Sequence, residues 1–286
     1  GAAEDMDESS TASVAAEQQQ PAPAMAEETN VAMAGPATTV EPAKPAADVD
    51  PSTVSAALEP SPEPEPVVTA PAATVASTPA DTGPIALREA ADSGDPKAMF
   101  EIGARYSEGR GTKADNAKAA EWYERAAELG VAPAQYRIGN MYEKGVGVTR
   151  DLKKAKTWYQ MAAEQGNASA MHNLAVLYAM GADGTTDNES AARWFNKAAG
   201  LGVKDSQFNL GILNAKGVGM PQNLEESYKW FALVAKTGDR DAAAKRDEIA
   251  NSLRPEQLDK ARAAAELWKA QPVDPAANVV DVPDEI

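Results

Sequence analysis

The chain has 286 residues, with 43 Asp and Glu against 27 Lys and Arg, five Trp, seven Tyr, four Phe and no cysteine. This composition indicates an acidic protein with room for one or two domains, and it excludes a disulfide framework, a thiolate metal site and a thiol nucleophile. The net charge of −16 would repel phosphate backbones, so we expect no nucleic-acid partner.

Residues 1–83 differ in composition from the rest of the chain. They hold 14 acids, one base (Lys44), 12 prolines and no aromatic residue. Such a segment lacks the apolar area that would offset the entropy cost of ordering it, so we predict a disordered acidic Pro/Ala-rich linker. Its Glu-Pro units, densest at residues 59–66, favour an extended backbone. The functional interpretation is a spacer that holds the next domain away from a surface, and the alternative is a plain solvated linker.

Residues 84–270 carry every aromatic side chain and repeat with a period of 36 residues. Four copies at a fixed period predict a solenoid in which each repeat packs on its neighbours. The clearest markers of the period are the pairs Trp122-Tyr123, Trp158-Tyr159, Trp194-Phe195 and Trp230-Phe231.

Each copy predicts a helix-turn-helix unit. In the second copy, Ile138, Gly139 and Tyr142 share one face of a first helix at residues 134–143, and the small residue lets a partner helix approach closely. A Gly-x-Gly turn follows, and then a short polar residue that can accept hydrogen bonds at the start of a second helix. These predicted N-caps are Asp115, Asp151, Asp187 and Asn223.

The ends of the repeat array predict capping helices. Residues 85–93 match only the second half of a unit, so we expect one covering helix there. Residues 242–252 and 255–269 predict a closing helix pair that breaks near Pro255. Residues 271–286 have four acids and no base, and we predict a disordered acidic tail.

The shared pattern Ala-x3-Leu/Ile-Gly-x2-Tyr-x2-Gly-x-Gly-x3-Asp-x3-Ala-x2-Trp-Tyr-x2-Ala-Ala-x2-Gly resembles the Sel1-like repeat, a relative of the tetratricopeptide repeat, from Ile85 to about Ala270. Two copies depart from it: Asp183 replaces the second turn glycine in the third, and Asn214 replaces the Tyr in the fourth. The resemblance implies an all-α solenoid of helix-turn-helix repeats that acts as a non-catalytic protein-protein interaction scaffold.

A narrower resemblance covers the junction of the fourth repeat with the closing helices, at residues 230–233, 243–248 and 258–268, together with the acidic lead-in. It is similar to the periplasmic part of the polar organelle development proteins of alphaproteobacteria, the PodJ family. This resemblance implies a bacterial periplasmic domain of an inner-membrane protein at a cell pole, with a membrane tether upstream of this fragment and envelope proteins as partners. Peptidoglycan is an alternative partner, although only a short acidic tail follows the repeats here.

Catalytic chemistry has little support in the sequence. With one histidine and no cysteine, neither a His-rich metal site nor a Cys-His pair can be assembled, so we expect no enzyme activity, no metal and no cofactor. The Gly-x-Gly motifs follow predicted helices and recur in every copy, which is typical of turns and not of phosphate-binding loops.

The remaining hypothesis is recognition on the concave face that first helices form in tetratricopeptide-like stacks. An aromatic column backed by a second column could hold an extended peptide or a helix, whereas the alternative is that successive first helices simply pack ring on ring. Two other functions stay open: a periplasmic regulator that binds a sensor kinase, and a carbohydrate or peptidoglycan binder that stacks sugars on Trp and Tyr. The candidate partner-binding residues are Phe100, Tyr136, His172 and Phe208 in the first column and Asn140, Val176 and Ile212 in the second.

Overall fold

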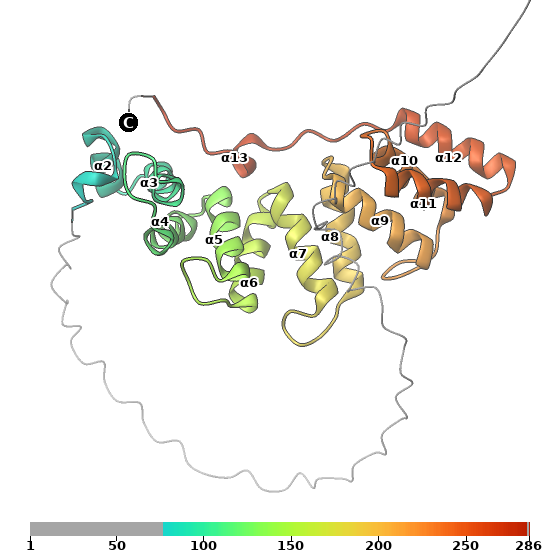
Figure 1. Cartoon of the computed structure of the whole chain (residues 1–286), viewed down its shortest axis with the longest axis horizontal. Coiled ribbons are helices and arrows are strands. Elements are labelled where there is room, and N and C mark those ends of the chain that lie inside the picture. Colours follow the sequence, from blue (N-terminus) through green and yellow to red (C-terminus); the bar gives the residue numbers. More distant parts are fainter. Residues whose placement is uncertain (1–76, 285) are drawn as a thin grey trace, which may run out of the picture. The chain divides into compact units, whose positions relative to one another are not determined.

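The computed structural model describes residues 77–284 and residue 286, and all the regular elements in these residues are helices (Figure 1). The predicted all-α solenoid is therefore confirmed for the described part of the chain. The disorder expected for residues 1–76 lies outside the described residues. The elements are η2 (Ala80–Thr82), α2 (Ile85–Asp92), α3 (Pro96–Glu108), α4 (Asn116–Glu128), α5 (Ala132–Lys144), α6 (Leu152–Glu164), α7 (Ala168–Met180), α8 (Asn188–Gly200), α9 (Lys204–Lys216), α10 (Leu224–Ala235), α11 (Arg240–Asn251), α12 (Pro255–Leu267) and α13 (Pro275–Asn278).

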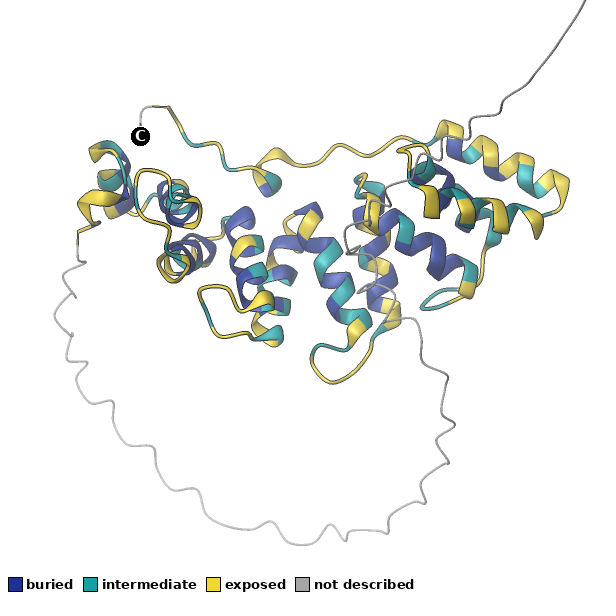
Figure 2. Cartoon of the chain, viewed as in Figure 1, coloured by how far each residue is buried: buried dark blue, intermediate teal, exposed yellow. Residues whose placement is uncertain are grey.

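Helices α3 to α10 form four consecutive pairs, one for each 36-residue repeat. Each helix packs against the next one along the chain, so that α3, α5, α7 and α9 are first helices and α4, α6, α8 and α10 are second helices. Helix α2 covers the beginning of the stack by packing on α3, whereas α11 and α12 both pack on α10. Buried residues lie where neighbouring helices face each other (Figure 2).

The helix boundaries follow the predicted capping chemistry. Asp115, Asp151, Asp187 and Asn223 precede the second helices, and each accepts a hydrogen bond from a main-chain N–H in the first helical turn. Each first helix ends at a glycine in the left-handed conformation, as at Gly145 with φ 69°. Both classes of signal were predicted correctly from the sequence, because they depend only on residues close in the chain.

The small-residue column of the first helices accepts the rings of the second helices. A Cβ at Gly139 would lie 2.8 Å from Cδ1 of Tyr159, and one at Gly211 would lie 2.6 Å from Cε1 of Phe231. Tyr159 is 0% exposed and Phe231 is 2% exposed. The predicted close approach of the two helices is therefore confirmed, and it is made by an aromatic ring lying on glycine.

The two departures from the repeat pattern alter their loops locally. Gly147 and Gly219 lie directly against the main-chain oxygens of Asn116 and Asn188, respectively, in the second helix of the preceding repeat. Asp183 takes the corresponding position in the third copy, where it accepts a 2.6 Å hydrogen bond from Lys156 Nζ. Asn214, which replaces the Tyr, is buried and donates to the main-chain oxygen of Leu210. In both cases a side-chain hydrogen bond replaces the packing of the regular repeat.

The solenoid begins earlier than predicted. Thr78 and Thr82 are buried, and the main-chain N–H of Thr78 donates to Oδ1 of Asp92 over 2.9 Å. Residues 77–83, which we assigned to the disordered linker, instead pack beside α2 as an extension of the cap. The prediction was wrong here because composition alone does not show that Thr78 binds Asp92 at the end of α2.

Residues 271–284 also differ from the expected disordered tail. They run from the end of α12 back toward the beginning of the stack, where α2 and α3 lie, and they include the short helix α13, which packs against α5 (Figure 1). Asp274 caps α13 by accepting from the main-chain N–H of Ala276. The acidic composition suggested disorder, but main-chain and amide hydrogen bonds to the repeats hold this segment.

Among the described residues, none of the helices combines the length and the apolar character needed to cross a membrane.

Candidate interaction surfaces

The predicted aromatic column lies on the first helices, where each of its four rings is half-buried. Each ring contacts the second-helix ring of its own repeat, and not the ring of the next first helix. The centroid distances are 5.3 Å for Phe100–Tyr123, 6.0 Å for Tyr136–Tyr159, 5.6 Å for His172–Phe195 and 5.4 Å for Phe208–Phe231.

These pairs give the aromatic column a packing role inside each repeat while one part of each ring stays exposed. Tilted and edge-on ring pairs at 5–6 Å are favourable geometries for aromatic packing. One direct link joins consecutive first helices: His172 Nδ1 lies 2.8 Å from Ser206 Oγ. Burial lowers the pKa of His172, and the nearby Asp205 carboxylate opposes this shift.

The second predicted column changes in character along the stack. Asn140 and Val176 are half-buried, whereas Ile212 is only 8% exposed. Near Asn140, the hydroxyl of Tyr159 donates to Glu143 Oε2 over 2.5 Å and accepts from Asn173 Nδ2 over 3.1 Å. We call the two columns together the first-helix face. It is polar in the second repeat and aliphatic in the fourth, so it offers different contacts along its length.

Tyr159 connects this face to the buried seam between helices. Burial raises the pKa of its hydroxyl strongly, and the Glu143 carboxylate raises it further, so the hydroxyl stays protonated and remains a donor. The hydrogen bonds at Tyr159 therefore hold Glu143 and Asn173 in place across two repeats. A ligand on the first-helix face would meet polar groups that are already oriented.

The repeat tryptophans are poorly placed for stacking on sugars. Trp122 and Trp230 are buried, and Trp158 and Trp194 are half-buried. Cations cover three of the four rings, with Arg125 Cζ 4.2 Å from the centre of Trp122, Lys197 Nζ 4.5 Å from Trp194 and Lys229 Nζ 4.3 Å from Trp230. Cation-π contacts of this kind use the ring faces that a carbohydrate would need.

A second surface was missed by the sequence reasoning. It consists of the turns between repeats, at residues 130–132, 166–168 and 200–204, and we call it the turn edge. Residues 270–286 are here called the closing segment, and those that the structure describes lie against the turn edge. Asn167 Nδ2 donates to the main-chain oxygen of Ala277 over 2.7 Å, and the main-chain N–H of Gln271 donates to the main-chain oxygen of Gly200 over 2.8 Å.

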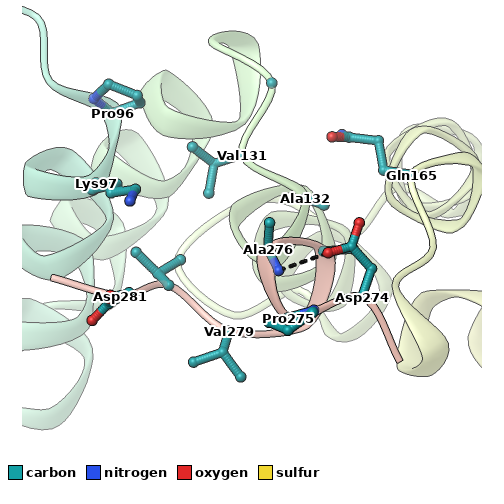
Figure 3. Close-up of a pocket in the computed structure, with 13 residues that line it drawn as sticks. Pro96, Lys97, Val131, Ala132, Gln165, Asp274, Pro275, Ala276, Val279 and Asp281 are labelled. Carbon is teal, nitrogen blue, oxygen red and sulfur yellow. Dashed lines mark hydrogen bonds between the residues drawn. The ribbon is translucent and has the colours of Figure 1, made fainter. Parts of the chain in front are cut away.

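The closing segment does not fill the space beside the turn edge. A pocket of about 710 Å³ remains between them, with Lys97, Val131 and Ala132 on one side and Asp274, Pro275 and Val279 on the other (Figure 3). A signal for the short helix α13, though not for its contact with the repeats, exists in the sequence: Asp274-Pro275 copies Asp95-Pro96, the N-cap and first residue of α3. It was overlooked because a single dipeptide in an acidic tail carries little weight.

No group of three or more His, Cys, Asp or Glu side chains in the described residues is arranged to hold a metal ion. The surfaces that the structure offers are therefore described by packing, hydrogen bonds and charge.

The sequence matches the Sel1 repeat family in four consecutive copies, at residues 96–131, 132–167, 168–203 and 204–239, which together cover just over half of the 286 residues. The chain belongs to the Sel1 repeat family. Each Sel1 copy corresponds to one helix pair, from α3–α4 to α9–α10. No curated protein sequence matches the chain.

Two solved structures support the Sel1 repeat assignment. A protective antigen of uropathogenic Escherichia coli that displays an SLR fold is 31% identical, with a TM-score of 0.56 over 63% of this chain. A Sel1 repeat protein from Oxalobacter formigenes is 27% identical, with a TM-score of 0.52 over 61% of this chain and 72% of its own. The present chain covers 40% of the length of the Escherichia coli antigen.

Proposed function

We propose that this Sel1 repeat protein is a non-catalytic scaffold that holds an extended peptide or a helix of a protein partner on its first-helix face. Sel1 repeat proteins generally act as protein-interaction scaffolds. The observation that carries the proposal is the row of half-buried rings, beside which Asn140, Asn173 and Val176 stay accessible. Rigid aromatic anchors next to oriented polar groups are typical of protein-binding surfaces.

We further propose that the partners are envelope proteins, and that the chain is the periplasmic part of a factor that recruits them to a cell pole. The support comes from the sequence at residues 230–233 and 243–248, where the fourth repeat runs into the closing helices, and from the acidic Pro/Ala-rich lead-in. In this arrangement residues 1–76 set the reach of the solenoid from the membrane.

The experiment is a capture assay with the full chain and solubilised envelope proteins, in which the bound protein is identified by mass spectrometry. Asn140→Arg places a long charged side chain on the first-helix face, whereas Thr157→Arg places the same group on an exposed position of α6. Both variants should keep the wild-type melting temperature, because neither site is fully buried.

We expect the wild-type chain and the T157R variant to capture the same envelope protein, and the N140R variant to lose it. Equal capture by both variants would remove the first-helix face as the binding surface. Co-sedimentation of the wild-type chain with purified cell-wall sacculi would instead assign the domain to wall binding. A fluorescent fusion that spreads evenly around the cell would contradict the polar role while leaving the scaffold intact.

A further inference from the structure

The closing segment is held on the turn edge by a reciprocal pair of asparagines. Asn167, which is 3% exposed, donates through Nδ2 to the main-chain oxygen of Ala277. Asn278 donates through Nδ2 to the main-chain oxygen of Gly166 over 3.2 Å and accepts through Oδ1 from the main-chain N–H of Ala168 over 2.9 Å. Each side-chain amide thus pairs with the main chain of the other segment, which is a recognition pattern and not a simple packing contact.

Only one of the turns can make this contact. Asn167 lies in a column with Asp95, Val131, Val203 and Asp239, each 36 residues apart. Its Oδ1 caps α7 by accepting from the main-chain N–H of Ala170 over 2.8 Å, which leaves Nδ2 to donate to the closing segment. An Asp in this column caps in the same way but has no N–H to donate, and Val does neither. The position of Asn167 therefore fixes where a segment docks.

The site also selects a small residue before the asparagine. Ala277 is 4% exposed, and a Cβ at Gly166 would lie 3.7 Å from its Cβ. The two residues that precede it and the residue that follows Asn278 are exposed. The segment that fits the site is thus Asp-Pro-x-small-Asn, where x is any residue: Asp and Pro start the helical turn of α13, Ala277 enters the turn edge, and Asn278 pairs with it.

Charge favours the same kind of segment. The N-termini of α5, α7 and α9 begin at the turn edge, and helix N-termini carry partial positive charge. The closing segment carries Asp274, Asp281 and Asp284 and has no base. An acidic segment is therefore the complementary occupant.

The hold on the closing segment is partial. Apart from Ala277, its described residues are exposed or half-buried, and the 710 Å³ pocket separates Val279 and its neighbours from Lys97 and Val131. A segment that buries one alanine and leaves a pocket beneath it can exchange with a competitor that fills the space.

We propose that the turn edge is a docking site for an extended acidic segment of a partner protein, of the form Asp-Pro-x-small-Asn followed by aliphatic residues, and that the closing segment is its intramolecular competitor. The aliphatic residues of the partner would enter the pocket beside Val131. This surface shares no residue with the first-helix face, so either proposal can fail without the other.

The test uses a fluorescent peptide with the sequence of residues 270–286 and full-length chains as receptors, with binding followed by anisotropy. A segment tethered through a few residues has an effective concentration near the millimolar range, so the wild-type chain should bind the peptide poorly. The Asn278→Ala chain has a weakened segment of its own and should bind the peptide at least tenfold more tightly. Adding Asn167→Asp, which keeps the cap of α7, should abolish this gain.

The matched control is a peptide that carries Asp in place of Asn278, which should not bind the N278A chain. Equal affinity of the wild-type and N278A chains for the peptide, or binding that is indifferent to N167D, would overturn the proposal. Dimers of the wild-type chain that N167D abolishes would also overturn it, because the occupant would then be a second copy of this chain.

The absence of native cysteine allows a second readout in the full chain. Cysteines introduced by Gly166→Cys and Ala277→Cys would have Cβ atoms about 3.7 Å apart, within the usual range for a disulfide. This pair should oxidise within one chain, whereas Gly130→Cys with Ala277→Cys should not, since nothing lies within 4 Å of a Cβ at Gly130. Failure of the first pair to cross-link faster than the second would contradict docking of the closing segment.

Discussion

The seams between helices and the closing segment are held in opposite ways. In the seams, Tyr159 and Phe231 lie on glycines with almost none of their surface exposed, and their neighbours leave no room for a methyl group. In the closing segment, Ala277 alone is buried among the described residues, and hydrogen bonds do most of the holding. Tight packing specifies one arrangement, whereas a segment held by a few hydrogen bonds and one buried side chain can be exchanged for a competitor.

The largest effect should come from the turn glycines that approach another main chain. Gly147 and Gly111 have nearly the same backbone, with φ of 72° and 73°. A Cβ at Gly147 would lie 2.1 Å from the main-chain oxygen of Asn116, whereas at Gly111 the nearest atom is Nη1 of Arg105 at 3.7 Å. Both Ala variants bear the cost of a left-handed backbone, about 1–2 kcal/mol. We expect Gly147→Ala to lower the free energy of unfolding by about 1–3 kcal/mol more than Gly111→Ala.

Urea denaturation of the two variants measures this difference. Gly219→Ala is a replicate, because its Cβ would lie 2.1 Å from the main-chain oxygen of Asn188. Equal destabilisation at Gly147 and Gly111 would mean that the turns of neighbouring repeats are not in contact, and that φ alone explains the glycine.

A smaller loss is expected where a ring lies on a first-helix glycine. Gly211→Ala would place a methyl group 2.6 Å from Phe231, and the ring is too buried to move freely. Overpacking costs about 1–3 kcal/mol, and the better helix propensity of Ala returns about 1 kcal/mol, so the net loss should be at most about 2 kcal/mol.

The third repeat supplies the control, because Ala175 occupies the same column there and is fully buried. Ala175→Gly should lower the free energy of unfolding by about 1 kcal/mol through helix propensity and by about 1 kcal/mol more through the loss of a buried methyl group. If Gly211→Ala raised stability in thermal melts, the seam would not be sterically filled.

Asn167 both caps a repeat helix and holds the closing segment, so its variants separate the stability of the repeats from the docking of that segment. Asn167→Ala removes the cap of α7 as well as the donor to Ala277, and the lost cap should cost about 1 kcal/mol. Asn167→Asp should keep nearly all of that stability, since Asp95 and Asp239 cap α3 and α11 from the same column. Hydrogen exchange should nevertheless become faster at the closing segment in N167D. A large loss of stability in N167D would show that the closing segment is part of the cooperative fold.

The features that could be predicted from the sequence are those that recur or act locally. The repeat period, the Asp and Asn caps and the Gly139 column are set by residues within one helix pair, so one copy confirms another. The aromatic column was located correctly, but its packing partners were not: Phe100 contacts Tyr123, 23 residues away in the same repeat.

The closing segment could not be predicted, because its contacts depend on differences between repeats. In the 36-residue alignment of the repeats, Asn167 departs from Val131 and Val203, and this departure creates the donor for Ala277. The partner residues lie 110 positions apart, and no local pattern links them. Residues 77–83 were missed for the related reason that Thr78 acts only through Asp92.

The smallest effect should appear in the pH dependence of stability, through the third repeat, where a histidine replaces the Tyr or Phe of the neighbouring copies. Because burial lowers the pKa of His172 below its ordinary value of 6.5, the unfolded chain binds a proton before the folded chain does. Stability should therefore fall as the pH drops through 6.5, and this fall should end below the folded pKa.

His172→Phe, which copies Phe100 and Phe208 in the same column, should flatten the pH dependence of the urea midpoint between about pH 5.5 and 7.5. Asp205→Asn should steepen it, since the carboxylate of Asp205 raises the pKa of His172 toward its ordinary value. If the H172F and wild-type chains lost stability in parallel over this range, His172 would be as easily protonated in the fold as in water, and the seam of the third repeat would be open to solvent.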